Sequence, residues 1–400
     1  MLNSRYVAMT SHESVIRKIF MYGKERAKVV GYDNVFDYSL GNPSVAVPDC
    51  FNRTLHQILD TQDDVTVHGY SPSLGISEAR QAIAQSLNQR YGMSYEEKHI
   101  FMTVSAAGAV AHALRAVLET PGDEIVTFAP YFSEYKPYVE GAGGQLVVTP
   151  ADTDTFQIYF EAFEALLTPQ VKAVLINTPN NPSGVVYSAR TLDRLAEILI
   201  RKSREYGHAI YIISDEPYRE LVFGEIEAPY VAAHYANTFT CYSFSKSMSI
   251  PGERIGYIAV HPECEDAEIA VQVFGQISRG IGHNCPPSLM QLAVARCADA
   301  TSDLSVYEEN KNILYRELTA LGFTCVEPGG TFYMFPRSLE PDDVAFCEKA
   351  KKYDLLLVPG TGFGCPGHFR IAYCVPTEKV IRSLEAFRQL AAEYASNIES

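Results

Sequence analysis

Three features that mark other classes of protein are missing from the sequence. No stretch approaches the roughly 20 consecutive apolar residues that a membrane-spanning helix requires. The first residues, Met1 to Arg5, include no apolar segment followed by a small-residue cleavage site, so we expect a cytoplasmic protein. The nine cysteines are scattered without a Cys-x-x-Cys pair, which argues against a zinc site or a disulfide framework and favours reduced, packed thiols.

Positive charge is also scarce. The chain has 33 Lys and Arg residues against 48 Asp and Glu residues, a net charge of −15. Such a surface repels phosphate backbones, so general nucleic-acid binding is disfavoured, although a few local arginines can still hold a small anion. The 400 residues, 47% hydrophobic and 20% charged, suit a globular protein of roughly two domains.

Between about residues 100 and 260, short apolar runs alternate with helical stretches. Short β-branched runs separated by helices indicate parallel strands joined by crossovers, hence an α/β sheet covered on both faces. Ligands of such sheets bind at the carboxyl ends of the strands. The predicted strands are Glu124–Phe128, Gln145–Val148, Ala173–Asn177, Ile210–Ser214, Phe239–Phe244 and Ile255–Val260, and the predicted helices include Ala106–Glu119 and Ser188–Tyr206.

After about residue 300, the pattern predicts the order helix, strand, strand, helix, strand, strand, helix, which is typical of a smaller α+β domain. Thr377 can cap the last helix, whose apolar positions from Val380 to Tyr394 recur at spacings of three and four. We therefore expect residues 1–44 to form an N-terminal arm and part of the small domain. Residues 45–295 would form the large domain, and residues 296–400 the small C-terminal domain.

The strongest chemical signal surrounds Lys246. Ser243-Phe244-Ser245-Lys246 follows directly on a predicted strand, and Arg254 comes eight residues later. The two serine hydroxyls can donate to phosphate oxygens, and the guanidinium can clamp a phosphate with two parallel hydrogen bonds. A lone lysine is most often a solvated surface charge. These neighbours instead favour a lysine whose amine projects from the carboxyl edge of the sheet.

Two further clusters follow strands. Asp215 comes after the apolar run Ile210–Ser214 and is predicted at the bottom of a pocket, where an unpaired charge is costly. The protonated pyridine nitrogen of pyridoxal phosphate would be a cationic partner, whereas a helix cap or turn is the alternative. Tyr218, three residues later, could reach the same cofactor. Asn181 lies in a Pro/Asn/Gly run that turn chemistry alone could explain.

Taken together, these clusters resemble the class I/II aminotransferases, which are fold type I pyridoxal-phosphate enzymes, and the aspartate-aminotransferase-like branch in particular. The resemblance runs from about Gly41 to the C-terminus. It implies a mostly parallel sheet with helices on both faces in a large domain, plus a smaller α+β domain. The matching segments are Leu40-Gly41-Asn42-Pro43, Tyr70-Ser71-Pro72, Pro121-Gly122-Asp123-Glu124, the Asn181 run, Asp215 with Tyr218, Ser243-x-x-Lys246 with Arg254, and Arg370-Ile371-Ala372-Tyr373.

The resemblance also implies a role for each residue around the cofactor ring. Lys246 would hold the cofactor covalently and then move a proton to and from the substrate's α-carbon. Asp215 would keep the pyridine nitrogen protonated, and Asn181 and Tyr218 would hydrogen-bond the phenolic oxygen. Phe132 stands where the family often stacks a tryptophan or tyrosine; the chain has no tryptophan, and a phenylalanine can stack but cannot donate a hydrogen bond.

Phosphate and substrate contacts are implied in the same way. The substrate's α-carboxylate would pair with Arg370, beside Gly41 and Asn181. Tyr70 would reach the phosphate of the neighbouring subunit, which implies a homodimer with shared active sites. Phosphate ligands at the N-terminus of a helix would be the amides of Ser105, Ala106 and Ala107, with Ser243, Ser245 and Arg254. This phosphate loop lacks the glycine that is common in the family.

We therefore expect a homodimeric aminotransferase that moves an amino group from an L-amino acid to a 2-oxo acid such as 2-oxoglutarate by a ping-pong mechanism. A C–S lyase (β-eliminase), a decarboxylase or a racemase on the same fold is the enzymatic alternative, because the cofactor supplies the difficult chemistry. A regulator that kept the fold as an amino-acid sensor would need a DNA-binding module. Only about forty residues precede Gly41, and they contain no basic helix-turn-helix pattern.

Arg279 bears on the choice of substrate. In the aspartate enzymes of this family, an arginine shortly before a similar Asn/Pro-Pro segment reaches the partner's active site and pairs with the substrate's distal carboxylate. The spacing from Arg279 to Pro286-Pro287 is one residue longer. A helix-end arginine that faces solvent or the dimer interface is the alternative. The first interpretation predicts a preference for aspartate or glutamate.

Overall fold

A seven-stranded sheet forms the centre of the structure, a computed structural model that describes residues 2–10 and 15–395. Neighbouring strands are parallel except on the two sides of β8. Residues 1 and 11–14 of the expected N-terminal arm, and residues 396–400 of the expected small domain, lie outside the described residues. The spatial order is β2 (Ile100–Thr103), β8 (Gly256–Val260), β7 (Thr238–Ser243), β6 (Tyr211–Asp215), β5 (Val171–Asn177), β3 (Glu124–Phe128), β4 (Gln145–Thr149).

All six expected strands are present, with ends shifted by no more than two residues. The expected mostly parallel sheet is confirmed, and β8, which is antiparallel to β2 and β7, is the exception among the strands described. Between β7 and β8 lie only the short helix α10 (Phe244–Ser247) and one 3-10 turn, so no helix crosses the sheet to return the chain in the parallel direction. The sequence reading also missed β2, a four-residue edge strand.

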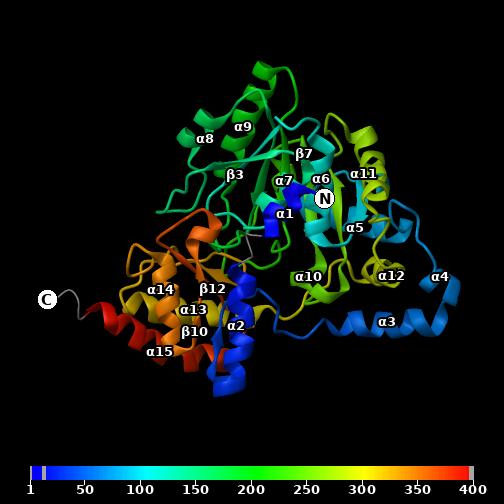
Figure 1. Ribbon diagram of the computed structural model, residues 1–400. Helices are drawn as coiled ribbons and strands as arrows, with labels where there is room; N and C mark the ends of the chain where they lie inside the picture. Colours follow the sequence, from blue (N-terminus) through cyan, green and yellow to red (C-terminus); the bar gives the residue numbers. More distant parts are fainter. Residues whose placement is uncertain (1, 11–14, 396–400) are drawn as a thin grey trace.

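Helices cover both faces of the sheet (Figure 1). Successive residues of a strand point to opposite faces, and β5 shows the result. Ala173 and Leu175 join an apolar cluster with α6 and α7, whereas Val174 and Ile176 join another with α9. The helices around the sheet are α5 (Ser77–Tyr91), α6 (Ser105–Val117), α7 (Tyr135–Ala142), α8 (Phe160–Leu166), α9 (Ala189–Tyr206), α11 (Ala267–Ile281) and α12 (Ser288–Cys297).

A second group of elements packs around a separate apolar core. The chain order here is helix, strand, helix, three strands, helix, so the expected pair of strands before the middle helix was wrong. Only β9 lies there, with isolated bridges at Gly330 and Arg337. The elements are α13 (Ser305–Ala320), β9 (Tyr333–Met334), α14 (Asp343–Ala350), β10 (Leu355–Leu356), β11 (Val358–Pro359), β12 (Phe369–Ala372) and α15 (Thr377–Ala395).

The N-terminal segments attach to this framework. After α1 (Ser4–Thr10), helix α2 (Val15–Val30) packs through Ile19 on the second group, and β1 (Phe36–Asp37) pairs with β10. Helices α3 (Asp49–Thr61) and α4 (Asp64–His68) lie at the edge of the molecule in Figure 1. They pack through Phe51, Ile58 and Val67 on an apolar cluster that also contains residues of α5 and α12.

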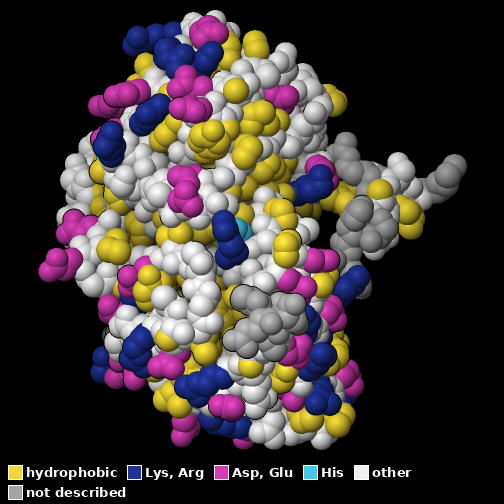
Figure 2. Space-filling model, turned by 90° about the vertical axis from the view of Figure 1, so that its left-hand side faces the viewer, with side chains coloured by type: hydrophobic (Ala, Val, Ile, Leu, Met, Phe, Trp, Pro, Cys, Tyr) yellow, Lys and Arg dark blue, Asp and Glu magenta, His cyan; other side chains and the backbone are white. Residues whose placement is uncertain are grey.

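The surface carries both signs of charge. Basic and acidic side chains are intermingled over the face drawn in Figure 2. None of the helices in the described part of the chain has the length and apolarity needed to cross a bilayer.

Gly256, the first residue of β8, lies where three backbone segments meet. A Cβ atom at this position would overlap the carbonyl oxygen of Tyr242 and lie 3.0 Å from the Cα of Ser105. We predict that Gly256→Ala lowers the free energy of unfolding by about 1–3 kcal/mol, because a packed backbone has to move. Gly252→Ala is the matched control, since its added Cβ meets no atom within 4 Å and should change stability by no more than about 0.5 kcal/mol. Urea denaturation curves of equal midpoint for both variants would contradict the prediction.

Candidate active site

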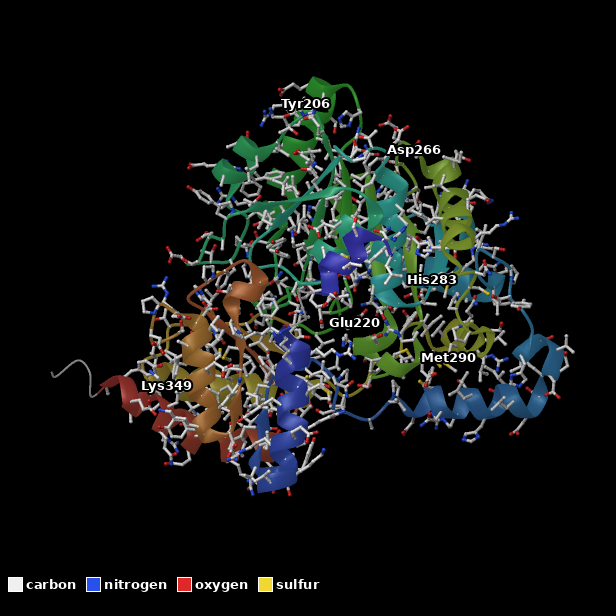
Figure 3. The ribbon with its side chains drawn as sticks, in the orientation of Figure 1. Tyr206, Glu220, Asp266, His283, Met290 and Lys349 are labelled. Carbon is white, nitrogen blue, oxygen red and sulfur yellow. The ribbon has the colours of Figure 1, made fainter. Side chains whose placement is uncertain are left out.

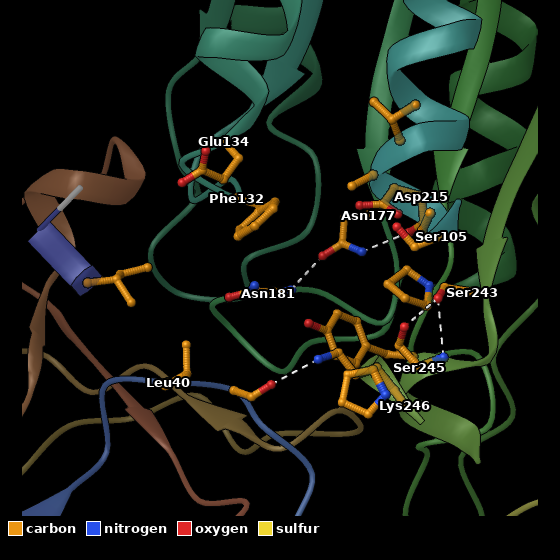
Figure 4. A pocket seen from close by; sticks show the side chains of 18 of the residues that line it. Leu40, Ser105, Phe132, Glu134, Asn177, Asn181, Asp215, Ser243, Ser245 and Lys246 are labelled. Atoms are coloured by element: carbon orange, nitrogen blue, oxygen red, sulfur yellow. Dashed lines mark hydrogen bonds between the residues drawn. The ribbon is translucent and has the colours of Figure 1, made fainter. Parts of the chain in front are cut away.

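A cavity of about 690 Å³ opens at the carboxyl edge of the central sheet. Strand β2 runs in the same direction as β7, because both are antiparallel to β8, so the ends of β2, β3, β5, β6 and β7 all meet at this edge. Thirteen of the fifteen predicted site residues line the cavity: Gly41, Ser105, Ala106, Ala107, Phe132, Asn181, Asp215, Tyr218, Ser243, Ser245, Lys246, Arg254 and Arg370. Figure 4 shows most of these side chains converging.

The other two predicted residues, Tyr70 and Arg279, do not contribute to the wall of this cavity. Tyr70 follows α4 and is 99% exposed. Arg279 is exposed in the last turn of α11. Both were predicted to act in the cavity of a partner subunit rather than in that of their own chain.

Lys246 lies on α10, in the first turn after β7. Its Nζ donates a hydrogen bond to the carbonyl oxygen of Gly41 at 2.8 Å (Figure 4) and lies 5.6 Å from the centre of the Phe332 ring. Burial lowers the pKa of Lys246 to about 8; the Cys374 thiol opposes this shift, and the nearby guanidinium groups of Arg254 and Arg370 add to it. A lysine with this pKa is neutral far more often near pH 7–8 than an ordinary lysine and is therefore a better nucleophile and base.

Asp215 is the last residue of β6 and is buried. The phenol of Tyr135 donates to its Oδ2 at 2.6 Å, whereas its Oδ1 has no hydrogen-bond partner among the described residues. Burial raises the pKa of Asp215 to about 7; the Tyr135 hydrogen bond lowers it, and the Glu216 carboxylate raises it. A buried oxygen without a partner is costly, so this geometry fits a ligand that supplies a donor, such as the protonated ring nitrogen of pyridoxal phosphate.

Asn177 connects Asp215 to the turn that carries Asn181. Its Nδ2 donates to the Asp215 carbonyl oxygen at 2.7 Å, and its Oδ1 accepts from the Asn181 amide at 2.6 Å (Figure 4). Asn181 Oδ1 in turn accepts from Nη1 of Arg370 at 2.9 Å. The buried Arg370 guanidinium retains an Nε without a partner among the described residues. A buried guanidinium with a free donor is suited to bind a carboxylate.

Donors for a phosphate gather at the start of α6. This helix begins at Ser105, directly after β2, and the first N–H groups of a helix have no partner within it. Nη2 of Arg254 donates to the Ser105 hydroxyl at 2.5 Å, and the hydroxyls of Ser243 and Ser245 lie 2.7 Å apart. Ser105 and Arg254 both have positive φ, 80° and 51°, a conformation that costs non-glycine residues on the order of 1 kcal/mol and is typical of ligand-binding loops.

Aromatic residues, among them Phe132, Tyr218 and Tyr333, shape the rest of the cavity. Phe132 lies on the opposite side from Lys246 (Figure 4), and its ring meets that of Tyr135 edge-on at 5.7 Å. The hydroxyls of Tyr218 and Tyr333 are 3.2 Å apart. A flat apolar face on one side and phenol groups nearby suit an aromatic ring that carries a phenolic oxygen.

The sequence analysis missed several residues of this region, among them Tyr333. Asn177 could have been found, because it is a polar residue that ends an apolar strand, as Asp215 does. Tyr135 gave no signal, since its contact with Asp215 depends on how α7 packs on the sheet. Two charged residues also line the cavity unpredicted: Arg17 of α2, and Glu134 at the start of α7, a half-buried carboxylate whose pKa is raised by burial.

Comparison with known proteins places this site in context. The family model described as aminotransferase class I and II matches residues 33–387. The chain is 31% identical to an aspartate aminotransferase of Thermotoga maritima over 90% of this chain and 93% of that protein. It is similar in structure to an aminotransferase from Eubacterium rectale (TM-score 0.96, 45% identity, 98% and 99% of the two chains). It is also similar to the aspartate aminotransferase of Thermus thermophilus with maleate (TM-score 0.86, 25% identity, 98% and 99%).

The raised pKa of Asp215 predicts a pH-dependent cost in the cofactor-free protein. A carboxyl group whose pKa rises from 3.8 to about 7 on folding binds more protons when folded, so stability falls as pH rises from about 4 to 7 and stays reduced above pH 7. We expect Asp215→Asn to stabilise the cofactor-free protein at pH 8, by at most about 4 kcal/mol, and much less near pH 4. Urea denaturation at the two pH values measures this difference.

Asp123→Asn is the control. Although burial acts to raise the pKa of Asp123, the backbone N–H groups of Thr120 and Glu119 lower it on balance. This variant should therefore lose stability at pH 8. A stability of Asp215→Asn equal to that of the natural protein at both pH values would contradict the raised pKa.

Proposed function

Because the chain belongs to the class I and II aminotransferases, we propose, residue by residue, how its cavity transfers an amino group. The protein is a pyridoxal-phosphate-dependent enzyme that transfers an amino group from an amino acid to a 2-oxo acid. When bound, the cofactor supplies an electron sink for the bond electrons released at the substrate's α-carbon. The observation that carries the residue assignment is the buried, unpartnered Oδ1 of Asp215 in the cavity that also holds Lys246.

Asp215 stabilises the charge on the cofactor, whereas Lys246 transfers the proton. The Oδ1 atom of Asp215 holds a proton on the cofactor's ring nitrogen, which keeps the ring electron-deficient. Nζ of Lys246 anchors the cofactor until substrate arrives, and the released amine then removes and returns the α-carbon proton. Burial, which lowers the pKa of this amine to about 8, supports that use, because a base works best when its pKa is near the operating pH.

The remaining residues bind and orient. Arg370, which has a free Nε donor, pairs with the substrate's α-carboxylate, beside the carbonyl oxygen of Gly41. Asn181 and Tyr218 contact the cofactor's phenolic oxygen, and Phe132 covers the face of the ring. The phosphate is held by the α6 amides of Ser105, Ala106 and Ala107, by Arg254, and by the hydroxyls of Ser243 and Ser245.

A dimer completes this proposal. The exposed Tyr70, which follows α4, reaches the phosphate in the partner subunit. We further infer a cytoplasmic protein whose large domain spans residues 45–295. The small domain spans residues 296–400 together with part of the N-terminal 44 residues. The separate apolar core around α13 and α15 supports this division.

We propose aspartate as the amino donor. Relatives named aspartate aminotransferase support this choice, as does the similar Thermus thermophilus enzyme with maleate, a dicarboxylate. Arg279 would pair with the distal carboxylate across the dimer interface. Arg17, which lines the cavity of its own chain, offers a second cation for the same task and therefore belongs in the experiment.

The covalent attachment is tested on Lys246. Borohydride reduction of the yellow holoenzyme, followed by peptide mapping, should find the cofactor on Lys246. Lys246→Ala should abolish this label and reduce turnover by about 10²- to 10⁴-fold, the usual contribution of a general base. Lys172→Ala, which removes a lysine paired with Asp123 outside the cavity, should leave both unchanged. Label on another lysine would overturn the assignment of the site.

Substrate choice is tested on Arg279, with Arg17 as the comparison. Arg279→Ala should reduce kcat/KM for aspartate far more than for alanine, because losing one partner of a buried ion pair costs roughly 3–5 kcal/mol. Arg17→Ala should then have little selective effect. If Arg17→Ala alone causes the selective loss, the cation lies within the same chain. Equal losses for both donors in both variants would exclude a distal-carboxylate preference read by either arginine.

A further inference from the structure

A buried ion pair lies directly behind the turn that carries Asp215 and Tyr218. Arg219 Nε donates to Glu216 Oε2 at 2.8 Å, and both side chains are buried. Asp215 and Tyr218 line the cavity, whereas Glu216 and Arg219 do not. The turn therefore presents Asp215 and Tyr218 to the active site and is anchored through Glu216 and Arg219.

Aromatic side chains surround the guanidinium of Arg219. Its central carbon lies 4.6 Å from the centre of the Tyr242 ring, 5.2 Å from that of Tyr230 and 5.6 Å from that of Tyr91. Nη1 donates to the Tyr257 hydroxyl at 3.2 Å. Cation–π contacts strengthen when the cation is removed from water, so this tyrosine cage holds the charge in one place.

Glu216 forms hydrogen bonds with residues of both β6 and β7. The hydroxyl of Ser214 donates to Oε1 at 2.7 Å, and the backbone N–H of Glu216 donates to the Cys241 carbonyl oxygen of β7 at 2.8 Å. An ion pair in such a place is seldom a net source of stability, because both charges must be removed from water. Its contribution is then a defined geometry for the turn rather than a large gain in free energy.

The same cluster extends to the segment that carries Lys246. The hydroxyl of Tyr242, which packs on Arg219, lies 2.8 Å from the hydroxyl of Ser247, the residue after the lysine. It also donates to Oε2 of Glu220 at 2.9 Å. Glu220 lies beside α10 (Figure 3). Polar contacts thus run without a break from the turn after β6, through Tyr242, to the helix after β7.

We propose that the Glu216–Arg219 pair is a positioning element for amino transfer, which fixes the turn after β6 so that Asp215 faces the cavity in register with Lys246. The inference rests on the roles proposed for Asp215 and Lys246, and the mapping of the cofactor onto Lys246 tests those roles separately. None of the four residues 216, 219, 220 and 242 touches the cavity.

The electrostatic part of this inference follows from the groups around Asp215. These are Tyr135 and Tyr138 of α7, Cys241 of β7, and Glu216 and Tyr218 of its own turn. Glu216 is the acidic one, and its charge raises the pKa of Asp215. Burial raises the pKa of Glu216, and the Arg219 charge opposes this shift. Without Arg219 the buried Glu216 should therefore bind a proton, so Arg219→Met and Glu216→Gln should both remove the negative charge next to Asp215.

The two charges are tested by removing them one at a time and together. Cofactor binding to the cofactor-free protein is measured by fluorescence from pH 5 to pH 9 for Arg219→Met, Glu216→Gln and the double variant. All three variants should shift the acid-side midpoint of binding to lower pH, because each removes the negative charge next to Asp215. Arg219→Met should also weaken cofactor binding roughly tenfold at pH 7 and reduce kcat more than it changes KM, because the turn loses its anchor.

Arg80→Met is the control, because it removes an arginine from another ion pair, with Glu97 at 3.0 Å, outside the cavity. It should lower stability without moving the midpoint of binding. Midpoints that do not move, or a kcat that is unchanged in Arg219→Met, would overturn the proposal. If Arg219→Met does not fold, Tyr242→Phe serves in its place. This variant keeps the ring and removes the contact with Ser247, so kcat should fall several-fold, and an unchanged kcat would contradict the link to Lys246.

Discussion

The site depends on one constraint of the sheet, namely that parallel strands bring their carboxyl ends to a single edge. Asn177, Asp215 and Ser243 are the last residues of β5, β6 and β7, three neighbours in the sheet. Asp215 and Ser243, which lie 38 and 66 positions after Asn177 in the sequence, therefore line the same cavity as Asn177. The reversal of β8 serves the same end, because an antiparallel strand begins where its neighbours finish. Arg254, two residues before β8, therefore lies at the same edge of the sheet as the other residues of the cavity.

Burial then decides the chemistry of what the sheet has assembled. It lowers the pKa of Lys246 to about 8 and raises that of Asp215 to about 7, so each group moves toward its neutral form. Burying these two charges without partners would cost free energy. In the proposed site, a ligand that offers a cationic N–H to Asp215 and a carbonyl carbon to Lys246 would relieve both costs at once. This relief would contribute to the affinity for the cofactor.

The departures from the family's usual residues are compatible with this arrangement. Phe132 cannot donate a hydrogen bond, yet its ring lies on the side of the cavity opposite Lys246 and meets Tyr135 edge-on, so stacking on a flat ligand needs no donor. The phosphate loop lacks a glycine at Ser105, and this residue nevertheless adopts a φ of 80°. Its hydroxyl is then bonded by Arg254, which ties the strained residue to the guanidinium beside it.

The sequence alone determined the elements with strong local signals and the residues that stand at their ends. The apolar runs predicted six strands, and the polar residues directly after them, Asp215 and Lys246 above all, predicted the site, because a strand end places its side chain without help from distant packing.

Only the tertiary structure decided the direction of β8 and the existence of β2, since an edge strand of four residues has too little periodicity to stand out. It also decided the partners of each charge. Tyr135 reaches Asp215 from a helix 80 residues earlier, and Arg219 finds its tyrosines on α5, β7 and the segment before β7. Such contacts join residues with no spacing rule between them, because they depend on how the helices pack on the sheet.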